Sequence, residues 1–230
     1  MATNDSEFPE RGRLWPGAIL GAIVHAIAVT QYPEISNEQS WDGDNYNVQD
    51  SMGSRGTISF SGDDLVGVFF DDDSPRNPFN SEDDGDYDLE VFLEGMPDGL
   101  RQLARERALQ YVLQDYEGAA QPIITAAFWS RGERLAAAEP WQEVFDNGAH
   151  LVRIQLMETE EAFDEWQEQY ELSDEQMALA RSVFERKMAD PTAPLKLEGR
   201  ELELLTSWAE SEEGMKECRE SFGEIGISLP

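Results

Sequence analysis

The sequence is richest in carboxylate side chains, and these are most concentrated between residues 63 and 98. That stretch holds thirteen acidic residues and a single base, Arg76. Within it, residues 71–88 combine prolines and asparagines with almost no apolar side chains, which is typical of a long loop. Clustered carboxylates on a loop attract and hold a positively charged partner. We expect such a contact to be made by Asp71, Asp72, Asp73, Asp83, Asp84, Asp86 and Asp88.

The same loop raises the alternative of a divalent cation site. Carboxylates alternate along the chain from Asp84 to Glu90, as they do at the start of a calcium loop, and calcium prefers six to eight oxygen ligands. The EF-hand pattern requires glycine at its sixth position and glutamate at its twelfth, where this sequence has Leu89 and Gly95. The pattern therefore fails. We predict no metal site and no cofactor, and the looser binding of a cation stays open.

Nucleophilic and acid–base catalysis have few candidate residues in this chain. Cys218 lies among Glu213, Glu217 and Glu220, and nearby negative charge raises a thiol pKa, which predicts an unreactive cysteine. Of the two histidines, His25 lies in an apolar run and is expected in the core. His150 is the better acid–base candidate, but no serine or cysteine motif accompanies it. We therefore predict no catalytic residue, with an Asp/Glu-dependent enzyme that uses His150 as an alternative.

The overall charge excludes several classes of partner. The chain carries 48 acidic against 17 basic residues, a net charge of −31. Nucleic-acid binding depends on Lys and Arg, and anionic membranes repel such a protein, so we expect neither as a partner. A single cysteine excludes an internal disulfide, and we expect a cytoplasmic location. Only three of the bases are Lys, which keeps adaptation to high salt open as another explanation of the acidity.

The elements expected to position the acidic loop lie on both sides of it. Residues 14–29 are almost entirely apolar but shorter than the roughly 20 residues of a membrane span, which favours a buried helix. Residues 45–70 predict an antiparallel meander, in which residues 57–60 and 65–70 pair around Gly62-Asp63. The apolar run 65–70 indicates a strand covered on both faces, and the 14–29 helix is the expected cover.

The chain becomes mainly helical after the loop. Ser173 and Gln176 match a capping box, and Thr159 precedes two glutamates that suit a helix start. The predicted fold class is α+β: an N-terminal buried helix packed on a small antiparallel sheet, then a mainly helical C-terminal half. We expect residues 1–95 and 96–230 to pack as one unit. Helices are expected at 97–116, from 159, at 173–188, at 198–209 and at 211–222.

These observations together favour a non-enzymatic acidic protein that recognises a basic protein partner, such as an inhibitor or an immunity-type protein. Small acidic proteins that neutralise cationic toxins use the same electrostatic attraction. A halophilic-type protein with a housekeeping role is the second interpretation, and an enzyme of unknown reaction is the third. The oligomeric state is not indicated by the sequence.

Overall fold

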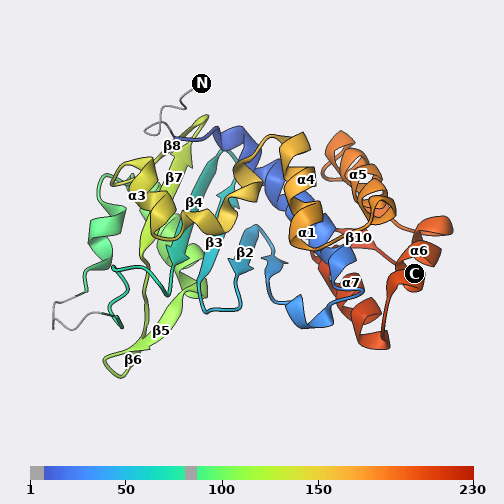
Figure 1. Ribbon diagram of the computed structural model, residues 1–230. Helices are drawn as coiled ribbons and strands as arrows, with labels where there is room; N and C mark the ends of the chain where they lie inside the picture. The colour runs from blue at the N-terminus through green and yellow to red at the C-terminus, as the bar shows by residue number, and fades with distance from the viewer. Residues whose placement is uncertain (1–7, 81–86) are drawn as a thin grey trace. The chain divides into compact units, whose positions relative to one another are not determined.

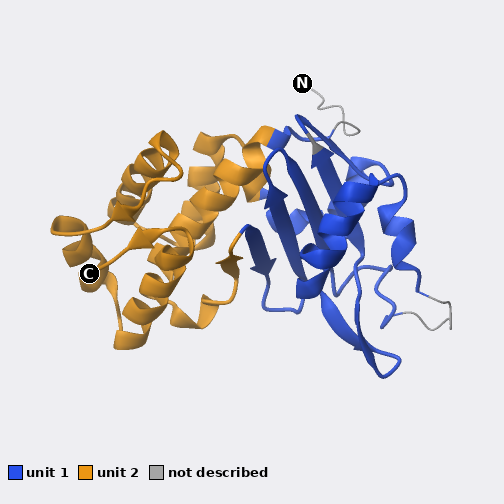
Figure 2. Cartoon of the chain, turned by 180° about the vertical axis from the view of Figure 1, so that it is seen from behind, with its two compact units in different colours: residues 1–11, 44–153 blue, residues 12–43, 154–230 orange. Residues whose placement is uncertain are grey.

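The computed structural model describes residues 8–80 and 87–230 as an α+β fold. The N-terminal helix, the antiparallel sheet and the mainly helical C-terminal half expected from the sequence are confirmed (Figure 1). The chain divides into two compact units (Figure 2). Unit 1 comprises residues 1–11 and 44–153, and unit 2 comprises residues 12–43 and 154–230. The change in composition near residue 95 falls inside unit 1 and coincides with no boundary between the units.

Unit 1 contains most of the strands. Its strands are β2 (Asn45–Gln49), β3 (Arg55–Ser61), β4 (Asp64–Phe70), β5 (Leu113–Tyr116), β6 (Ala119–Pro122), β7 (Ala126–Arg131) and β8 (Arg134–Ala136). Its helices are α2 (Asp98–Glu106), α3 (Trp141–Asp146) and the 3-10 helices η3 (Leu89–Leu93), η4 (Ala108–Tyr111) and η5 (Ala149–Val152). The 3-10 helix η1 (Arg11–Arg13) contains the first point in the sequence at which the chain passes from unit 1 to unit 2.

Unit 2 contains most of the helices. Its helices are α1 (Leu14–Ala28), α4 (Thr159–Gln169), α5 (Asp174–Ala189), α6 (Arg200–Trp208), α7 (Glu212–Glu224) and the 3-10 helices η2 (Pro33–Ile35) and η6 (Ile154–Leu156). Its strands are β1 (Gln39–Asp42), β9 (Leu195–Lys196) and β10 (Ile227–Ser228), of which β9 and β10 pair in parallel.

The predicted hairpin forms the centre of the unit 1 sheet. β3 and β4 pair antiparallel around Gly62-Asp63, with Phe60 opposite Leu65, so this prediction is confirmed. Consecutive strands of the main sheet follow in the order β2-β3-β4-β7-β8, all antiparallel. Successive side chains of a strand point to opposite faces. Val66 and Val68 therefore share one face of β4, and Leu65 and Phe69 share the other, all four buried.

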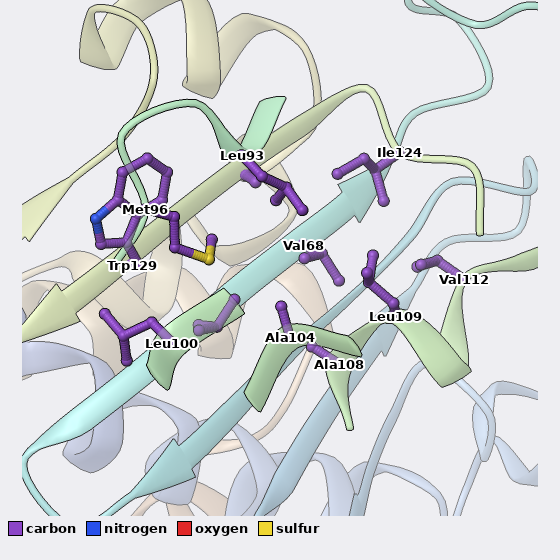
Figure 3. Packing of buried hydrophobic residues seen from close by; sticks show 12 residues of the cluster. Val68, Leu93, Met96, Leu100, Ala104, Ala108, Leu109, Val112, Ile124 and Trp129 are labelled. Carbon is purple, nitrogen blue, oxygen red and sulfur yellow. The ribbon is translucent and has the colours of Figure 1, made fainter. Parts of the chain in front are cut away.

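Both faces of β4 are covered by elements of unit 1. On one face, Val68 packs with Leu100 of α2 and with Leu109 of η4 in a buried apolar cluster (Figure 3). On the other face, the Phe69 and Phe128 rings are 5.5 Å apart, and Trp141 of α3 lies 5.9 Å from Phe128. The sequence favoured residues 14–29 as this cover. Within unit 1, α2 and η4 supply this cover on one face and α3 contributes to it on the other.

Helix α1 forms the buried centre of unit 2. Twelve of its fifteen residues are buried, as its uniformly apolar sequence predicts. It packs against α4, α5 and α7 (Figure 1) and also against η6. Helix α7 approaches closely because it presents a glycine: a Cβ atom on Gly214 would lie 2.4 Å from the Thr30 carbonyl oxygen. The helices of the C-terminal half thus bury the helix that begins unit 2.

Local signals set most helix starts correctly. The capping box at Ser173 is present, with the Gln176 N–H donating to the Ser173 hydroxyl and the Gln176 side chain accepting from the Ser173 N–H. Helix α4 begins at Thr159 as expected. The helix expected at 97–116 is wrong in its second half, since α2 ends at Glu106 and residues 113–116 form β5.

Candidate functional site

A buried network of small polar side chains holds the acidic loop that follows β4. The Asp71 carboxylate accepts hydrogen bonds from the Ser54 hydroxyl (3.2 Å) and from the Asp73 N–H (3.1 Å). The Asp71 N–H donates to the Thr125 hydroxyl (2.9 Å), which also lies 2.6 Å from the Asn147 carbonyl oxygen. Asp71 is only 6% exposed, and Ser54, Thr125 and Asn147 are buried too. Paired polar groups of this kind fix a unique backbone path. Asp71 therefore supports the loop from inside.

The next two acidic residues of the loop, Asp72 and Asp73, are exposed. The Asp72 carbonyl oxygen accepts hydrogen bonds from the side-chain amides of Asn77 (2.9 Å) and Asn80 (2.6 Å). The Asp72 N–H donates to the Ser54 hydroxyl at 3.0 Å. The backbone that carries these two carboxylates is thus held in place, while their side chains remain accessible to a partner.

Asp88 lies at the other end of the loop and is exposed as well. Its carboxylate caps η3, accepting a hydrogen bond from the Glu90 N–H at 2.9 Å. The remaining three residues expected at the site, Asp83, Asp84 and Asp86, lie outside the described residues. Of the four that are described, three are exposed and one is buried.

The one base of residues 63–98 is engaged by carboxylates from elsewhere in unit 1. The Arg76 guanidinium forms ion pairs with Glu139 and with Glu143, the latter at 2.8 Å. It also donates to the Thr125 carbonyl at 3.3 Å. These contacts tie the loop to the start of α3. Because Arg76 is paired in this way, it does little to offset the charge of Asp72 and Asp73.

Five aromatic rings form a row beside the acidic loop. In order, the neighbouring ring centroids are 6.4 Å apart (Phe70–Phe79), 5.6 Å apart (Phe79–Tyr116), 6.1 Å apart (Tyr116–Tyr87) and 6.2 Å apart (Tyr87–Phe92). Tyr116 comes from the β5–β6 hairpin, so the row joins the two ends of the loop to a separate element. Phe79 is 49% exposed, which makes it the open part of this row.

The Tyr87 hydroxyl forms two hydrogen bonds with the backbone of Ile124. It donates to the Ile124 carbonyl oxygen (3.0 Å) and accepts from the Ile124 N–H (2.7 Å). Burial raises the pKa of Tyr87 well above its ordinary value, so the hydroxyl keeps its proton at neutral pH. The double hydrogen bond fixes this ring, and the ring in turn supports Tyr116.

Two further exposed apolar side chains lie near the loop. Met52 is 67% exposed. Its neighbour Gly53 is close to the loop, since a Cβ atom added to Gly53 would lie within 4 Å of the Asp72 side chain. Leu113 is 40% exposed; its carbonyl oxygen accepts a hydrogen bond from Arg55, whose guanidinium lies over the Phe70 ring at 5.5 Å. We define the acidic aromatic surface by the accessible residues of this region: Met52, Asp72, Asp73, Phe79, Tyr87, Asp88, Leu113 and Tyr116.

The aromatic and apolar part of this surface was missed by the sequence analysis. Phe79 is the one large apolar residue in residues 71–80, which follow β4. A single aromatic side chain in an otherwise polar loop could have indicated an exposed contact residue. Tyr116 carried no such signal, since residues 97–116 were assigned to a single helix. Its proximity to Phe79 depends on the β5–β6 hairpin, which pairs Tyr116 with Ala119.

His150, the acid–base candidate, and Cys218, predicted to be unreactive, lie in different surroundings. The Nδ1 atom of His150 lies 3.2 Å from the Phe145 carbonyl oxygen, and within residues 8–80 and 87–230 no carboxylate hydrogen-bonds this ring. Burial raises the pKa of the Cys218 thiol to about 12, so burial rather than nearby glutamates keeps it protonated. Among the described residues no three His, Cys, Asp or Glu side chains are grouped to hold a metal ion.

Comparisons with protein-family models, with curated proteins and with solved structures give no match for this chain. In the part of the chain that the structure describes, no helix is both long and apolar enough to cross a membrane.

Proposed function

We propose that the acidic aromatic surface of unit 1 binds a basic protein partner, and that this chain is a non-enzymatic, cytoplasmic binding protein of the inhibitor or immunity type. One observation carries the proposal. Exposed Phe79 stands in a fixed row of aromatic rings, and exposed Asp72 and Asp73 lie on a hydrogen-bonded loop beside it. Apolar anchors surrounded by charged residues are the usual arrangement of protein interfaces.

The two kinds of side chain contribute differently to binding. Exposed carboxylates raise the rate of encounter with a cationic protein, since the attraction acts over about a Debye length. Aromatic rings bury apolar area after contact and bind guanidinium groups through cation–π attraction, so they slow dissociation. A basic partner rich in arginine would satisfy both. A nucleic acid would be repelled by the same carboxylates.

The test begins with capture of binding proteins from a lysate of the source organism and measurement of association and dissociation rates. We expect the double variant D72N/D73N to associate several-fold more slowly, with a weaker dependence on salt. F79S should leave association nearly unchanged and dissociate about tenfold faster, which corresponds to loss of a modest anchor.

Matched controls separate the surface from the general charge of the chain. E168Q/E185Q removes two exposed carboxylates from α4 and α5 of unit 2, and V91S removes an exposed apolar side chain from η3 of unit 1. Both variants should bind as the unaltered chain does. Equal slowing by D72N/D73N and E168Q/E185Q would show an unspecific charge effect, and a captured partner that is not basic would refute the proposal.

A further inference from the structure

Unit 2 contains a pocket whose lining differs from the surface described above. It has a volume of about 320 Å³ and lies between the α1–β1 connection and the end of α4. Two tyrosines and three glutamates supply most of its lining, and no lysine or arginine takes part. The lining residues are Tyr32, Glu34, Ile35, Glu38, Gln169, Tyr170 and Glu171.

Tyr170 forms a wall of this pocket that is rigid before any ligand arrives. The residue is buried, and its ring stacks on Trp166 with centroids 5.5 Å apart and planes 6° apart. His25 of α1 lies 6.1 Å from the same ring. The Tyr170 hydroxyl accepts a hydrogen bond from the Gln39 side-chain amide (2.9 Å) and donates to the Glu38 carboxylate (3.1 Å). Both the ring face and the hydroxyl are therefore held in position.

The pocket carries negative charge from residues that make no ion pair with any described residue. Glu34 and Glu171 are both exposed at its edge. Glu171 follows directly on Tyr170 and adopts a left-handed backbone conformation, with φ at +51°. Glycine is the residue favoured in this conformation after a helix end, because a side chain makes the left-handed backbone less stable. Glutamate is therefore not favoured here by its backbone conformation. The carboxylate is what glutamate adds at this position.

Aromatic faces combined with carboxylates select an organic cation. The ring of a tyrosine attracts an ammonium or guanidinium group, and carboxylates accept its hydrogen bonds. An anion would be repelled. A bare metal ion is less well served, because no group of three metal-ligating side chains occurs among the described residues. The volume suits a small molecule with a short aliphatic body.

We propose that this pocket binds a small organic cation that carries a guanidinium or primary ammonium group on a short aliphatic chain. The cation lies against Tyr32 and Tyr170, and Glu34 and Glu171 accept its hydrogen bonds. The inference is independent of the proposed function, since all lining residues belong to unit 2 and the acidic aromatic surface belongs to unit 1.

The experiment is calorimetric titration of the whole chain with agmatine, which carries both cationic groups, and with the uncharged analogue N-butylurea. We expect saturable binding of agmatine and none of N-butylurea. E34Q/E171Q should raise the dissociation constant for agmatine about tenfold, and Y32L should raise it by a similar factor. E168Q/E185Q, which removes the same charge outside the pocket, should bind agmatine as the unaltered chain does.

A second measurement guards against a folding effect. E171G removes the carboxylate and relieves the left-handed glutamate, so it should raise the thermal midpoint while it weakens agmatine binding. That opposite change in stability and affinity is not expected of a merely structural residue. No saturable binding of agmatine up to about 10 mM, or equal weakening by E168Q/E185Q, would overturn the proposal.

Discussion

His25 illustrates how burial controls an ionisable side chain in this protein. It lies in α1 and is 1% exposed, and its Nε2–H donates to the Ile35 carbonyl oxygen at 2.9 Å. Burial lowers its pKa from 6.5 to about 4, although the hydrogen bond to Ile35 acts in the opposite direction. The imidazole is therefore neutral in the folded protein at neutral pH.

This state makes the contribution of His25 to stability depend on pH. Between pH 6.5 and about 4 the unfolded chain binds a proton at His25 and the folded chain does not, so stability is lost as the pH falls through this range. We expect the free energy of unfolding of the unaltered chain to fall by about 2–3 kcal/mol relative to H25Q between pH 7.5 and 4.5. Urea denaturation of the unaltered chain and of H25Q at the two pH values measures this difference. Parallel pH profiles would contradict the assignment.

Asp71 and Asp72 are neighbours with opposite roles, which no sequence pattern separates. In D71A the Ser54 hydroxyl and the Asp73 N–H lose their buried acceptor, and we expect a loss of about 1–3 kcal/mol in the free energy of unfolding. D72A removes an exposed carboxylate and should change stability by less than about 0.5 kcal/mol. Urea denaturation at neutral pH distinguishes the two. An equally small effect of D71A would show that the network does not hold the loop.

Glycine contacts set the packing of whole elements, and α7 offers a matched pair. At Gly214 an added Cβ would meet the Thr30 carbonyl oxygen at 2.4 Å, whereas at Gly223 it would meet nothing within 4 Å. G214A must push α7 away from the end of α1, and we expect it to cost about 2–4 kcal/mol. G223A should stabilise by up to about 1 kcal/mol, because alanine favours a helix. Thermal unfolding of both variants tests this, and a neutral G214A would mean that the helices separate easily.

The elements that the sequence predicted correctly are those whose signals are local. The β3–β4 hairpin follows from its turn residues, and α5 follows from its capping box. The helix expected at 97–116 failed at Arg107, where φ is −128° and ψ is −78°. Its last residues instead join a hairpin whose turn, Glu117-Gly118, has two positive φ angles. That turn resembles an ordinary helix end in sequence, because a glycine with positive φ is also common just after a helix.

The net charge of −31 predicts a moderate dependence of stability on salt. Exposed ion pairs such as Arg181–Glu160 relieve part of the repulsion. We expect cooperative thermal unfolding at about 0.05 M salt, with a midpoint that rises by a few degrees up to about 0.5 M and then levels off. Scanning calorimetry across this range is the measurement. Loss of cooperative folding at low salt would favour the alternative of adaptation to high salt.

The two sites differ in how far the sequence could indicate them. The acidic loop could be recognised in the sequence as a run of carboxylates. The sequence did not show which of these carboxylates are buried. The pocket of unit 2 was not visible, because its two tyrosines, Tyr32 and Tyr170, are far apart in the chain. Their meeting depends on α1 and α4 packing in the same unit. Contacts of this kind depend on tertiary structure, and the spacing of residues in the sequence does not predict them.

The division of unit 2 into residues 12–43 and 154–230 has a consequence for the time course of synthesis. Helix α1 leaves the ribosome before α5 and α7, which bury it and follow only after residues 44–153 of unit 1 have been made. At about 5–20 residues per second this delay lasts on the order of 10–40 s. Throughout that interval the most apolar segment of the nascent chain lacks these partners. A chaperone that holds apolar segments at the ribosome should therefore bind α1 and release it only when α7 has emerged.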